Sequence, residues 1–145
     1  MADRDGKKDP YRSYRFRVEI DGLERAGFRE CSGLDFTHDP VEYREGPDPL
    51  TARKLPGLIK YSNISLKWGL SDDKELWDWR KEAMDGTVKR KNGSIVLLDD
   101  ANEEKMRWNF REGWPSKWTG PSFNATGNEV AIETLEIAHE GLEKA

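Results

Sequence analysis

This 145-residue chain has 28 carboxylates but only two histidines and one cysteine. Any two of the carboxylates could converge as a glycosidase pair, but no spacing in the sequence indicates one. The two histidines, His38 and His139, lie far apart, and nothing pairs locally with the single cysteine, Cys31. A metal centre, or a nucleophile with its base, needs several such groups in one place. We therefore expect ordinary histidines and a buried, unreactive thiol, with no catalytic residue, no metal ligand and no cofactor.

The charged clusters also lack the spacing of a binding site. Two acidic doublets, at 99–100 and 103–104, flank Asn102. An EF-hand loop instead alternates its oxygen ligands and ends on a distant glutamate, so the doublets predict a solvated hairpin turn. The basic run Lys89–Lys91 is more typical of a solubilising turn than of a phosphate site. The chain is therefore predicted not to be an enzyme.

The aromatic segment Trp114–Trp118, with the sequence WPSKW, is the remaining candidate binding element. We predict a rigid loop from Trp114 to Pro121. Its indoles are suited to stacking on sugars or bases, or to filling the edge of a core or a subunit interface. Packing or interface is favoured, and a carbohydrate- or peptide-binding module is kept as an alternative.

Composition restricts the class of protein further. The chain has 24 basic and 28 acidic residues, a net charge of −4, and 36% charged residues. This balance argues against a dedicated nucleic-acid binder, which is usually basic. The N-terminal stretch has no apolar run, and no segment approaches the roughly 20 apolar residues of a membrane-spanning helix. We expect synthesis in the cytoplasm without a signal peptide, and no membrane insertion by this chain alone.

Alternation of apolar and polar residues predicts several half-buried strands. The clearest are 14–20, 62–68 and 106–111, and weaker ones are 27–36 and 41–44. Asn92-Gly93, between 87–91 and 94–98, is typical of a two-residue hairpin turn. A bulge is expected at Ser32-Gly33 and a kink near Ser62-Asn63. Residues 128–141 fit helical and strand spacing equally well, and the β-rich context favours a strand.

One helix is predicted, at about 72–85. Asp72 with Glu75 resembles a capping pair, and Gly86 is a natural stop. Its apolar arc is predicted to dock on the sheets and contains Leu76, Trp77, Trp79, Ala83 and Met84. The fold class is therefore mainly β: a single domain over 1–145, with a mobile arm at 1–10. It is an antiparallel β-sandwich or barrel of six to eight strands, with the one flanking helix and a long projecting loop at about 45–58.

The 45–58 loop needs a function, because compact domains rarely keep a long loop without one. Its prolines stiffen it, which lowers the entropy lost when it binds a partner. Its apolar side chains favour contact over exposure. We predict a docking arm on a neighbouring subunit, whose interface residues are Pro47, Pro49, Leu50, Arg53, Lys54, Leu55, Pro56, Leu58 and Ile59.

Several segments, in order, resemble a known family. They are YRFRVEIDGLERAGFRECSGLDF, KLPGLIKYSNISLKWGL, ELWDWRKEAMDG, KRKNGSIVLLDD, RWNFREGWPSKWTGP and NEVAIETLEIAHEGLE. Together they resemble the tail tube proteins of contractile phages, and most of all the inner-tube proteins of phage-like extracellular contractile injection systems. The resemblance runs from about Pro10 to Gly141 and contains no catalytic motif.

The resemblance implies a structural role. Such proteins form hexameric rings that stack into a hollow tube inside a contractile sheath, and the inner sheets of six copies join into one β-barrel around the bore. The implied partners are other copies of the chain, the sheath, baseplate and terminator or cap proteins, and effector or DNA cargo in the lumen. The alternative within this fold is the tube component of type VI secretion. Candidate polar positions facing the lumen or the outside are Arg15, Arg17, Glu19, Ser65 and Lys67.

Overall fold

The computed structural model describes residues 3–4, 7–8, 15–21, 23–25, 27–47, 50, 52–71, 74–127 and 130–145. The first part of the chain contains β1 (Asp3–Arg4), β2 (Lys7–Lys8), β3 (Phe16–Ile20), β4 (Leu23–Arg25), β5 (Phe28–Ser32), β6 (Phe36–Tyr43), β7 (Arg53–Tyr61) and β8 (Ile64–Gly69). The second part contains α1 (Glu75–Met84), β9 (Lys91–Leu98), β10 (Glu104–Thr119), β11 (Ile132–Ala138) and β12 (Gly141–Lys144). The mainly β class with a single flanking helix is confirmed among these residues. The arm predicted at 1–10 lies mostly outside them.

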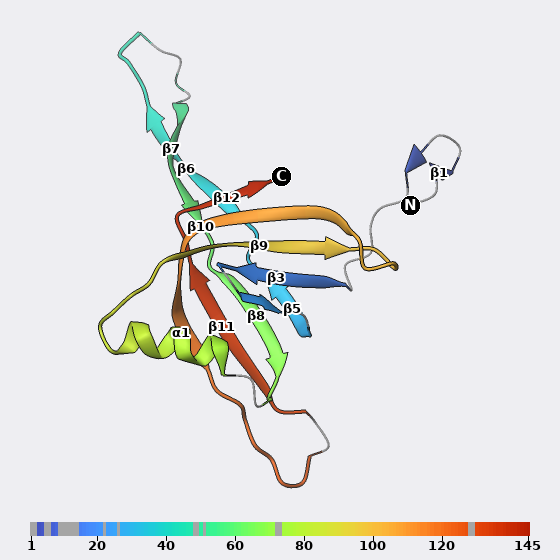
Figure 1. Ribbon diagram of the computed structural model, residues 1–145. Helices are drawn as coiled ribbons and strands as arrows, with labels where there is room; N and C mark the ends of the chain where they lie inside the picture. The colour runs from blue at the N-terminus through green and yellow to red at the C-terminus, as the bar shows by residue number, and fades with distance from the viewer. Residues whose placement is uncertain are drawn as a thin grey trace.

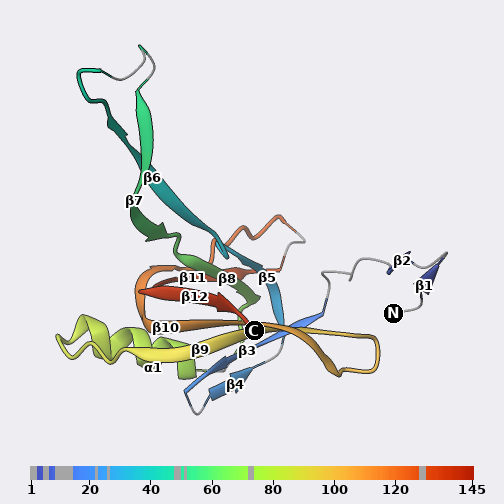
Figure 2. The same ribbon diagram turned by 90° about the horizontal axis from the view of Figure 1, so that it is seen from above.

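Two packed antiparallel sheets share the long strand β10 (Figures 1 and 2). The first half of β10 joins a sheet of order β4-β3-β9-β10-β12, here called the five-stranded sheet. Its second half joins a sheet of order β10-β11-β8-β5, here called the four-stranded sheet. Between the halves, Glu112 has a φ of 54° and the register shifts, so the strand turns from one sheet into the other. The described strands of one chain do not close into a barrel.

The core lies between these sheets, and α1 covers one end of it. The predicted alternation of β3 and β8 is confirmed, because Val18, Ile20, Ile64, Leu66 and Trp68 are all buried. The ambiguous C-terminal segment is a strand, and Leu135 and Ile137 on β11 are fully buried opposite Leu66 and Ile64 of β8.

Helix α1 differs from its prediction at its start and on its apolar arc. It begins at Glu75, and Lys74 at its N-cap makes no side-chain capping bond. Asp72, the expected cap, lies outside the described residues. Leu76 and Trp79 are buried, and the Trp79 indole N–H donates to the Lys89 carbonyl at 2.9 Å. Trp77 and Met84, predicted to face the core, are 42% and 60% exposed, because they lie at the margins of the arc.

The prediction of a hairpin turn at Asn92-Gly93 is wrong. Both residues lie inside β9, and the preceding residues 87–90 form no strand. A Cβ atom at Gly93 would lie 2.4 Å from the Phe110 ring and 2.6 Å from the Glu19 carbonyl oxygen. The glycine is therefore needed for close packing. The Asn92 side chain accepts the N–H of Glu112 at 3.0 Å, beside the β10 bend.

The prediction of an aromatic loop at 114–121 is also wrong for residues 114–119. Trp114–Thr119 are the second half of β10 and pair with β11. Pro115 is buried at the shared strand, and Trp118 stacks edge-on between Trp68 and Trp77, at 5.3 Å from each. This segment therefore packs within the protein and does not form an open stacking platform.

The projecting element predicted at 45–58 exists, but its second part, from Arg53 onward, is a β-strand and not a loop. β6 and β7 form a two-stranded antiparallel ribbon that leaves the sandwich and pairs with no other described strand (Figure 1). Strand β7 begins at Arg53, so only the segment between Tyr43 and Arg53 connects the two strands. The ribbon is called the β6–β7 hairpin below.

Candidate assembly surfaces

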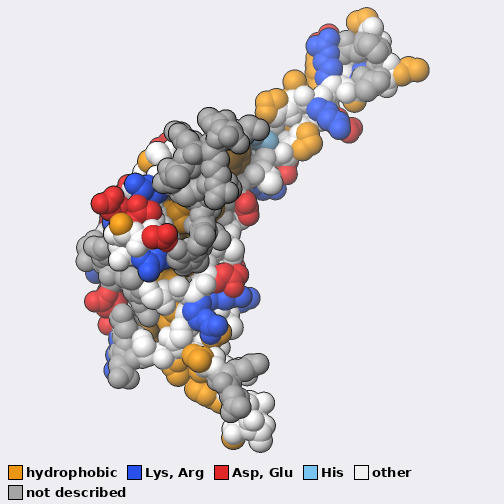
Figure 3. All heavy atoms as spheres, turned by 90° about the vertical axis from the view of Figure 1, so that its right-hand side faces the viewer, with side chains coloured by type: hydrophobic (Ala, Val, Ile, Leu, Met, Phe, Trp, Pro, Cys, Tyr) orange, Lys and Arg blue, Asp and Glu red, His pale blue; other side chains and the backbone are white. Residues whose placement is uncertain are grey.

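The β6–β7 hairpin exposes apolar side chains along its whole length (Figure 3). Leu50 near the tip is 94% exposed and Leu58 is 82% exposed. The other exposed apolar residues of the hairpin are Phe36, Val41, Tyr43, Leu55 and Ile59. Clusters of exposed hydrophobic side chains on one projecting element mark an interaction site. Eight of the nine residues predicted as subunit interface are exposed here, and Pro49 lies outside the described residues.

A bulge shapes the middle of the hairpin. The register shifts between His38 and Pro40, and a Cβ atom at Gly57 would lie 2.2 Å from the Asp39 carbonyl oxygen. Lys60 and Asp39 form an ion pair at 2.6 Å on the surface. The hairpin is therefore held together by the pairing of its own two strands, and the bulge twists it.

The base of the hairpin is fixed where two chain segments cross. Gly33 has a φ of +89°, and a Cβ atom there would lie 1.9 Å from the Asn63 carbonyl oxygen. The N–H of Ser62 donates to the Asp35 carbonyl at 3.1 Å. The kink predicted near Ser62-Asn63 is the break between β7, which ends at Tyr61, and β8, which begins at Ile64. The bulge predicted at Ser32-Gly33 is instead the end of β5, and the register of that strand shifts earlier, between Phe28 and Glu30.

His139 ties this base to the start of β12. Its Nε2 lies 3.0 Å from the Ser62 carbonyl oxygen, and its Nδ1 lies 3.1 Å from the Gly141 carbonyl oxygen. Its ring packs against Tyr61, with centroids 5.5 Å apart. Both polar partners are carbonyl oxygens, so a neutral imidazole, which carries one N–H, donates to one of them. The ring thereby links the hairpin base to the sandwich.

The five predicted polar-face residues lie on two different faces. Arg17 and Glu19 lie on β3, on the outer face of the five-stranded sheet, and Arg15 just before β3 donates to Asn102 at 2.8 Å. Ser65 and Lys67 lie on β8, on the outer face of the four-stranded sheet. The sandwich separates these two groups, so they cannot both face one lumen.

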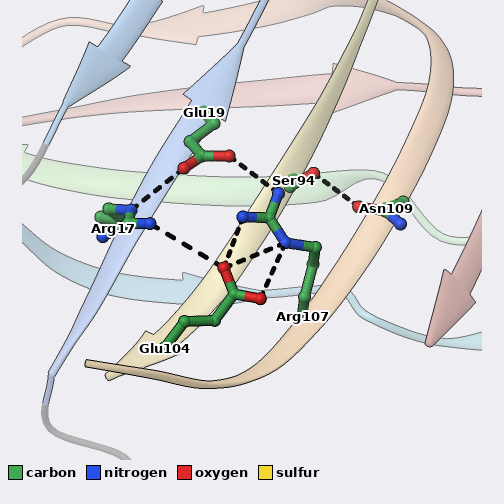
Figure 4. Close-up of polar contacts among 6 residues, drawn as sticks. All are labelled: Arg17, Glu19, Ser94, Glu104, Arg107 and Asn109. Atoms are coloured by element: carbon green, nitrogen blue, oxygen red, sulfur yellow. Dashed lines mark hydrogen bonds and ion pairs between the residues drawn. The ribbon is translucent and has the colours of Figure 1, made fainter. Parts of the chain in front are cut away.

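On the five-stranded sheet, four charged side chains form one network (Figure 4). Arg107 donates to Glu19 at 2.8 Å and to Glu104 at 2.5 Å, and Arg17 contacts Glu19 at 3.1 Å. Val96 lies between Arg17 and Arg107 in the strand register and is fully buried. The arginine stems shield this valine from water, while their guanidinium groups neutralise the carboxylates.

This network lowers the pKa of both carboxyl groups. The hydrogen bond from Arg107 is the main cause for Glu19 and for Glu104, and the charge of Arg17 adds to it. A carboxyl group whose pKa is lower in the folded state stabilises the fold above its unfolded pKa. That contribution is lost as the pH falls through the folded-state pKa.

Arg107→Ala is expected to lower the melting temperature by a few degrees at pH 7, because Val96 loses its cover and two carboxylates lose their partner. Between about pH 5 and pH 3 the wild type loses the contribution of the two carboxylates by protonation. The difference in melting temperature between wild type and Arg107→Ala therefore becomes smaller. Thermal unfolding followed by circular dichroism at both pH values measures this. Arg90→Ala, which breaks an exposed pair with Glu140, is the control. A difference that stays constant with pH would contradict the assignment.

The four-stranded sheet carries a face of hydroxyls and compensated charges. Lys67 on β8 lies 3.6 Å from Glu30 on β5, and Lys117 on β10 lies 3.7 Å from Glu136 on β11. By strand register, the central uncharged positions on this face are Ser32, Ser65, Thr119 and Thr134, and its ends carry Trp114 with Ala138 and, opposite Gly69, Ile132. The centre of the face is polar, and the charges of its two ion pairs cancel.

The candidate chemical residues do not converge in the described part of the chain. Cys31 is half-buried against the core, and burial, with the neighbouring Glu30 carboxylate, raises the pKa of its thiol to about 12. No group of three or more potential metal ligands occurs among the described residues. The acidic doublets form the predicted turn, where the Asp99 carboxylate accepts the N–H groups of Ala101 and Glu103 at 2.9 Å. Within the same ranges, no helix is long and apolar enough to span a membrane.

Comparison with solved structures shows which proteins share this architecture. One similar chain comes from the sheath–tube complex of the PVC extracellular contractile injection system in its extended state. It is 33% identical, with a TM-score of 0.85 over 94% of this chain and 91% of that chain. Another comes from the tube-terminating cap of the anti-feeding prophage. It is 31% identical, with a TM-score of 0.86 over 99% of this chain and 95% of that chain.

More distant chains share the fold alone. Hcp1 from Flavobacterium johnsoniae is 17% identical, with a TM-score of 0.58 over 90% of this chain and 94% of that chain. A search of curated proteins finds no match. The family model for the T4-like virus tail tube protein gp19 matches residues 12–143. This chain therefore belongs to the gp19 tail tube protein family, the tube proteins of contractile phage tails and injection systems.

Proposed function

We propose that this chain forms hexameric rings that stack into a hollow tube, and that a contracting sheath drives this tube through a target envelope. Its role is mechanical and not enzymatic. Family membership and the likeness to chains from a sheath–tube complex and a tube cap support this proposal. Sheath, baseplate and cap proteins are then its partners, and effector or DNA is the cargo in the bore.

The four-stranded sheet is the observation that carries the ring proposal. Its strands alternate in direction, so its edge strands β5 and β10 are antiparallel to each other. Both edges are open in the described chain: β5 pairs only with β8, and Trp114–Thr119 pair only with β11. Copies joined β5 to β10 around an axis therefore continue one antiparallel barrel and leave neither edge of this sheet unpaired.

The five-stranded sheet is less suited to closing a ring. Its edge strands β4 and β12 have three and four residues. They run in the same direction, because three strands lie between them and each strand is antiparallel to its neighbours. Copies joined at these edges would pair in parallel over short segments, which is the weaker arrangement. We therefore assign Ser65 and Lys67 to the lumen, and Arg15, Arg17 and Glu19 to the outside of the tube.

The nine predicted interface residues are proposed to join ring to ring. The β6–β7 hairpin continues from the ends of β5 and β8, so in a β5–β10 ring it projects beyond the ring rather than around it. A type VI tube component is the second candidate, supported by the fold shared with Hcp1. The higher identity and TM-score of the injection-system chains favour the first.

Accessibility to a bulky thiol reagent tests the ring and its orientation. Lys67→Cys and Arg15→Cys are made separately. Burial and the high pKa of the Cys31 thiol keep the native cysteine slow to react. With a maleimide carried by a large polymer, both variants should react as monomers. In tubes checked by electron microscopy, only Arg15→Cys should react, because position 67 faces the bore. Equal labelling of both in tubes would refute the orientation, and a chain that never forms rings would refute the function.

A further inference from the structure

We propose that a hollow between α1 and the end of β10 receives the β6–β7 hairpin of a copy in the next ring. This inference rests on the proposed function, which gives the hairpin an inter-ring role but does not say where it docks. The hollow has a volume of about 380 Å³. Its apolar lining is Leu70, Trp77 and Trp118, and its polar lining is Ser71, Lys74, Asp78, Lys81 and Glu133. It is called the α1 groove below.

The α1 groove and the hairpin lie at opposite ends of the four-stranded sheet. Ser32 pairs with Ser65 at the end that continues into the hairpin, and Phe28 pairs with Trp68 at the other end. From that second end the chain continues through Gly69 to Leu70, which lines the groove. Figure 1 shows the hairpin at the top of the molecule and α1 toward the bottom. A hairpin therefore cannot fill the groove of its own chain.

The groove exposes apolar side chains, and this exposure does not stabilise a folded monomer. Trp77 is 42% exposed, although its indole stacks edge-on against Trp118 at 5.3 Å, and Leu70 is 46% exposed. Behind them Trp118 contacts the buried Trp68, so the floor of the groove is held rigidly by the core. Exposed aromatic side chains on a rigid floor are typical of an interface centre.

The hairpin has the complementary chemistry. Leu50, Leu55 and Leu58 are exposed apolar side chains, and Arg53 and Lys54 lie beside them. Asp78 and Glu133 of the groove supply charges opposite to these, and Glu42, the register partner of Lys54, is the hairpin's acidic counterpart to the groove lysines Lys74 and Lys81. Apolar contacts surrounded by charges of both signs match the usual centre and rim of a protein interface.

The placement of the two surfaces decides what assembly they produce. A projection on one end and a receptor on the other form a heterologous contact, which repeats from copy to copy without closing. Lateral β5–β10 pairing closes a ring, and this second contact is separate from it and extends the assembly along the axis. The two steps should therefore be separable by mutation.

Trp77→Glu tests the receptor. The charge in the groove is expected to leave hexameric rings intact in size-exclusion chromatography and negative-stain microscopy, with stacked tubes reduced to isolated rings. Val88→Glu is the matched control, because Val88 is similarly exposed (48%) but does not line the groove. Tubes of wild-type length from Trp77→Glu would overturn the inference while leaving the ring proposal standing.

Disulfide trapping tests whether the hairpin docks in the α1 groove even if Trp77→Glu does not fold. The double variant Leu58→Cys with Leu70→Cys, oxidised in assembled tubes, should give a ladder of cross-linked chains on a non-reducing gel. Leu58→Cys with Val88→Cys should give none. Tubes that show no ladder would refute this docking site, whereas a wild-type chain that forms no rings at all would refute the proposed function itself.

Discussion

Replacing residues 39–58 by an Asn-Gly dipeptide should leave a folded sandwich that forms rings but no tubes. His38 and Ile59 are directly opposite in the β6–β7 register, so a two-residue turn joins them without moving either strand. The removed residues are exposed except for Gly57 and Ala52 and those outside the described ranges, and none belongs to the buried core. We therefore expect a melting temperature within a few degrees of the wild type, measured beside negative-stain microscopy.

The control for this deletion is Lys60→Ala. It removes one exposed ion pair with Asp39 but keeps the hairpin and all its apolar side chains. Because exposed ion pairs contribute little, its tubes should resemble those of the wild type at ordinary salt. Normal tubes from the shortened chain would show that stacking does not use the hairpin, whereas an unfolded shortened chain would show that the hairpin stabilises the sandwich.

The sequence predicted the strands whose side chains alternate between core and water, because burial of one face leaves a period of two. This holds for β3 and β8, where Val18 and Leu66 face inward and Glu19 and Lys67 outward. It also predicted the presence and approximate end of α1. What periodicity cannot give is pairing over long sequence separations, so the sharing of β10 between two sheets was missed.

Two local errors have specific physical causes. Asn92-Gly93 has the composition of a turn, yet Gly93 is needed because the Phe110 ring and the Glu19 carbonyl leave no space for a Cβ atom. Trp114–Trp118 has the composition of a loop, yet it is a paired strand, and the chain bends before it, at Glu112 and Gly113. In both cases a tertiary contact determined the structure, and local propensity was overridden.

The proposed interface was predictable in part for a related reason. Leucines between prolines in a long connecting segment indicate a partner surface from sequence alone, because exposed leucines do not stabilise a monomer. Which polar face meets the lumen depended on strand direction at the sheet edges, and that is a property of topology. The α1 groove had no sequence signal, since Trp77 occupies a helical position that also suits a core.

Gly33→Ala is expected to have the largest effect of any Gly→Ala substitution among the described glycines. The φ of Gly33 is +89°, and the new Cβ would lie 1.9 Å from the Asn63 carbonyl oxygen, which is part of the backbone and cannot rotate away. Left-handed strain and overpacking together should lower the free energy of unfolding by about 2–5 kcal/mol. The clash also separates the two segments at the hairpin base, so tube formation should fail even where the sandwich remains folded.

Gly27→Ala separates the two causes, because Gly27 has the same φ of +89° but nothing within 4 Å of its Cβ position. It should lose only the backbone contribution, about 1–2 kcal/mol, and should still assemble into tubes. Urea unfolding of both variants, together with electron microscopy, measures the difference. Equal destabilisation by the two substitutions would mean that the Gly33–Asn63 crossing does not hold the hairpin base, and the orientation of the hairpin would then need another cause.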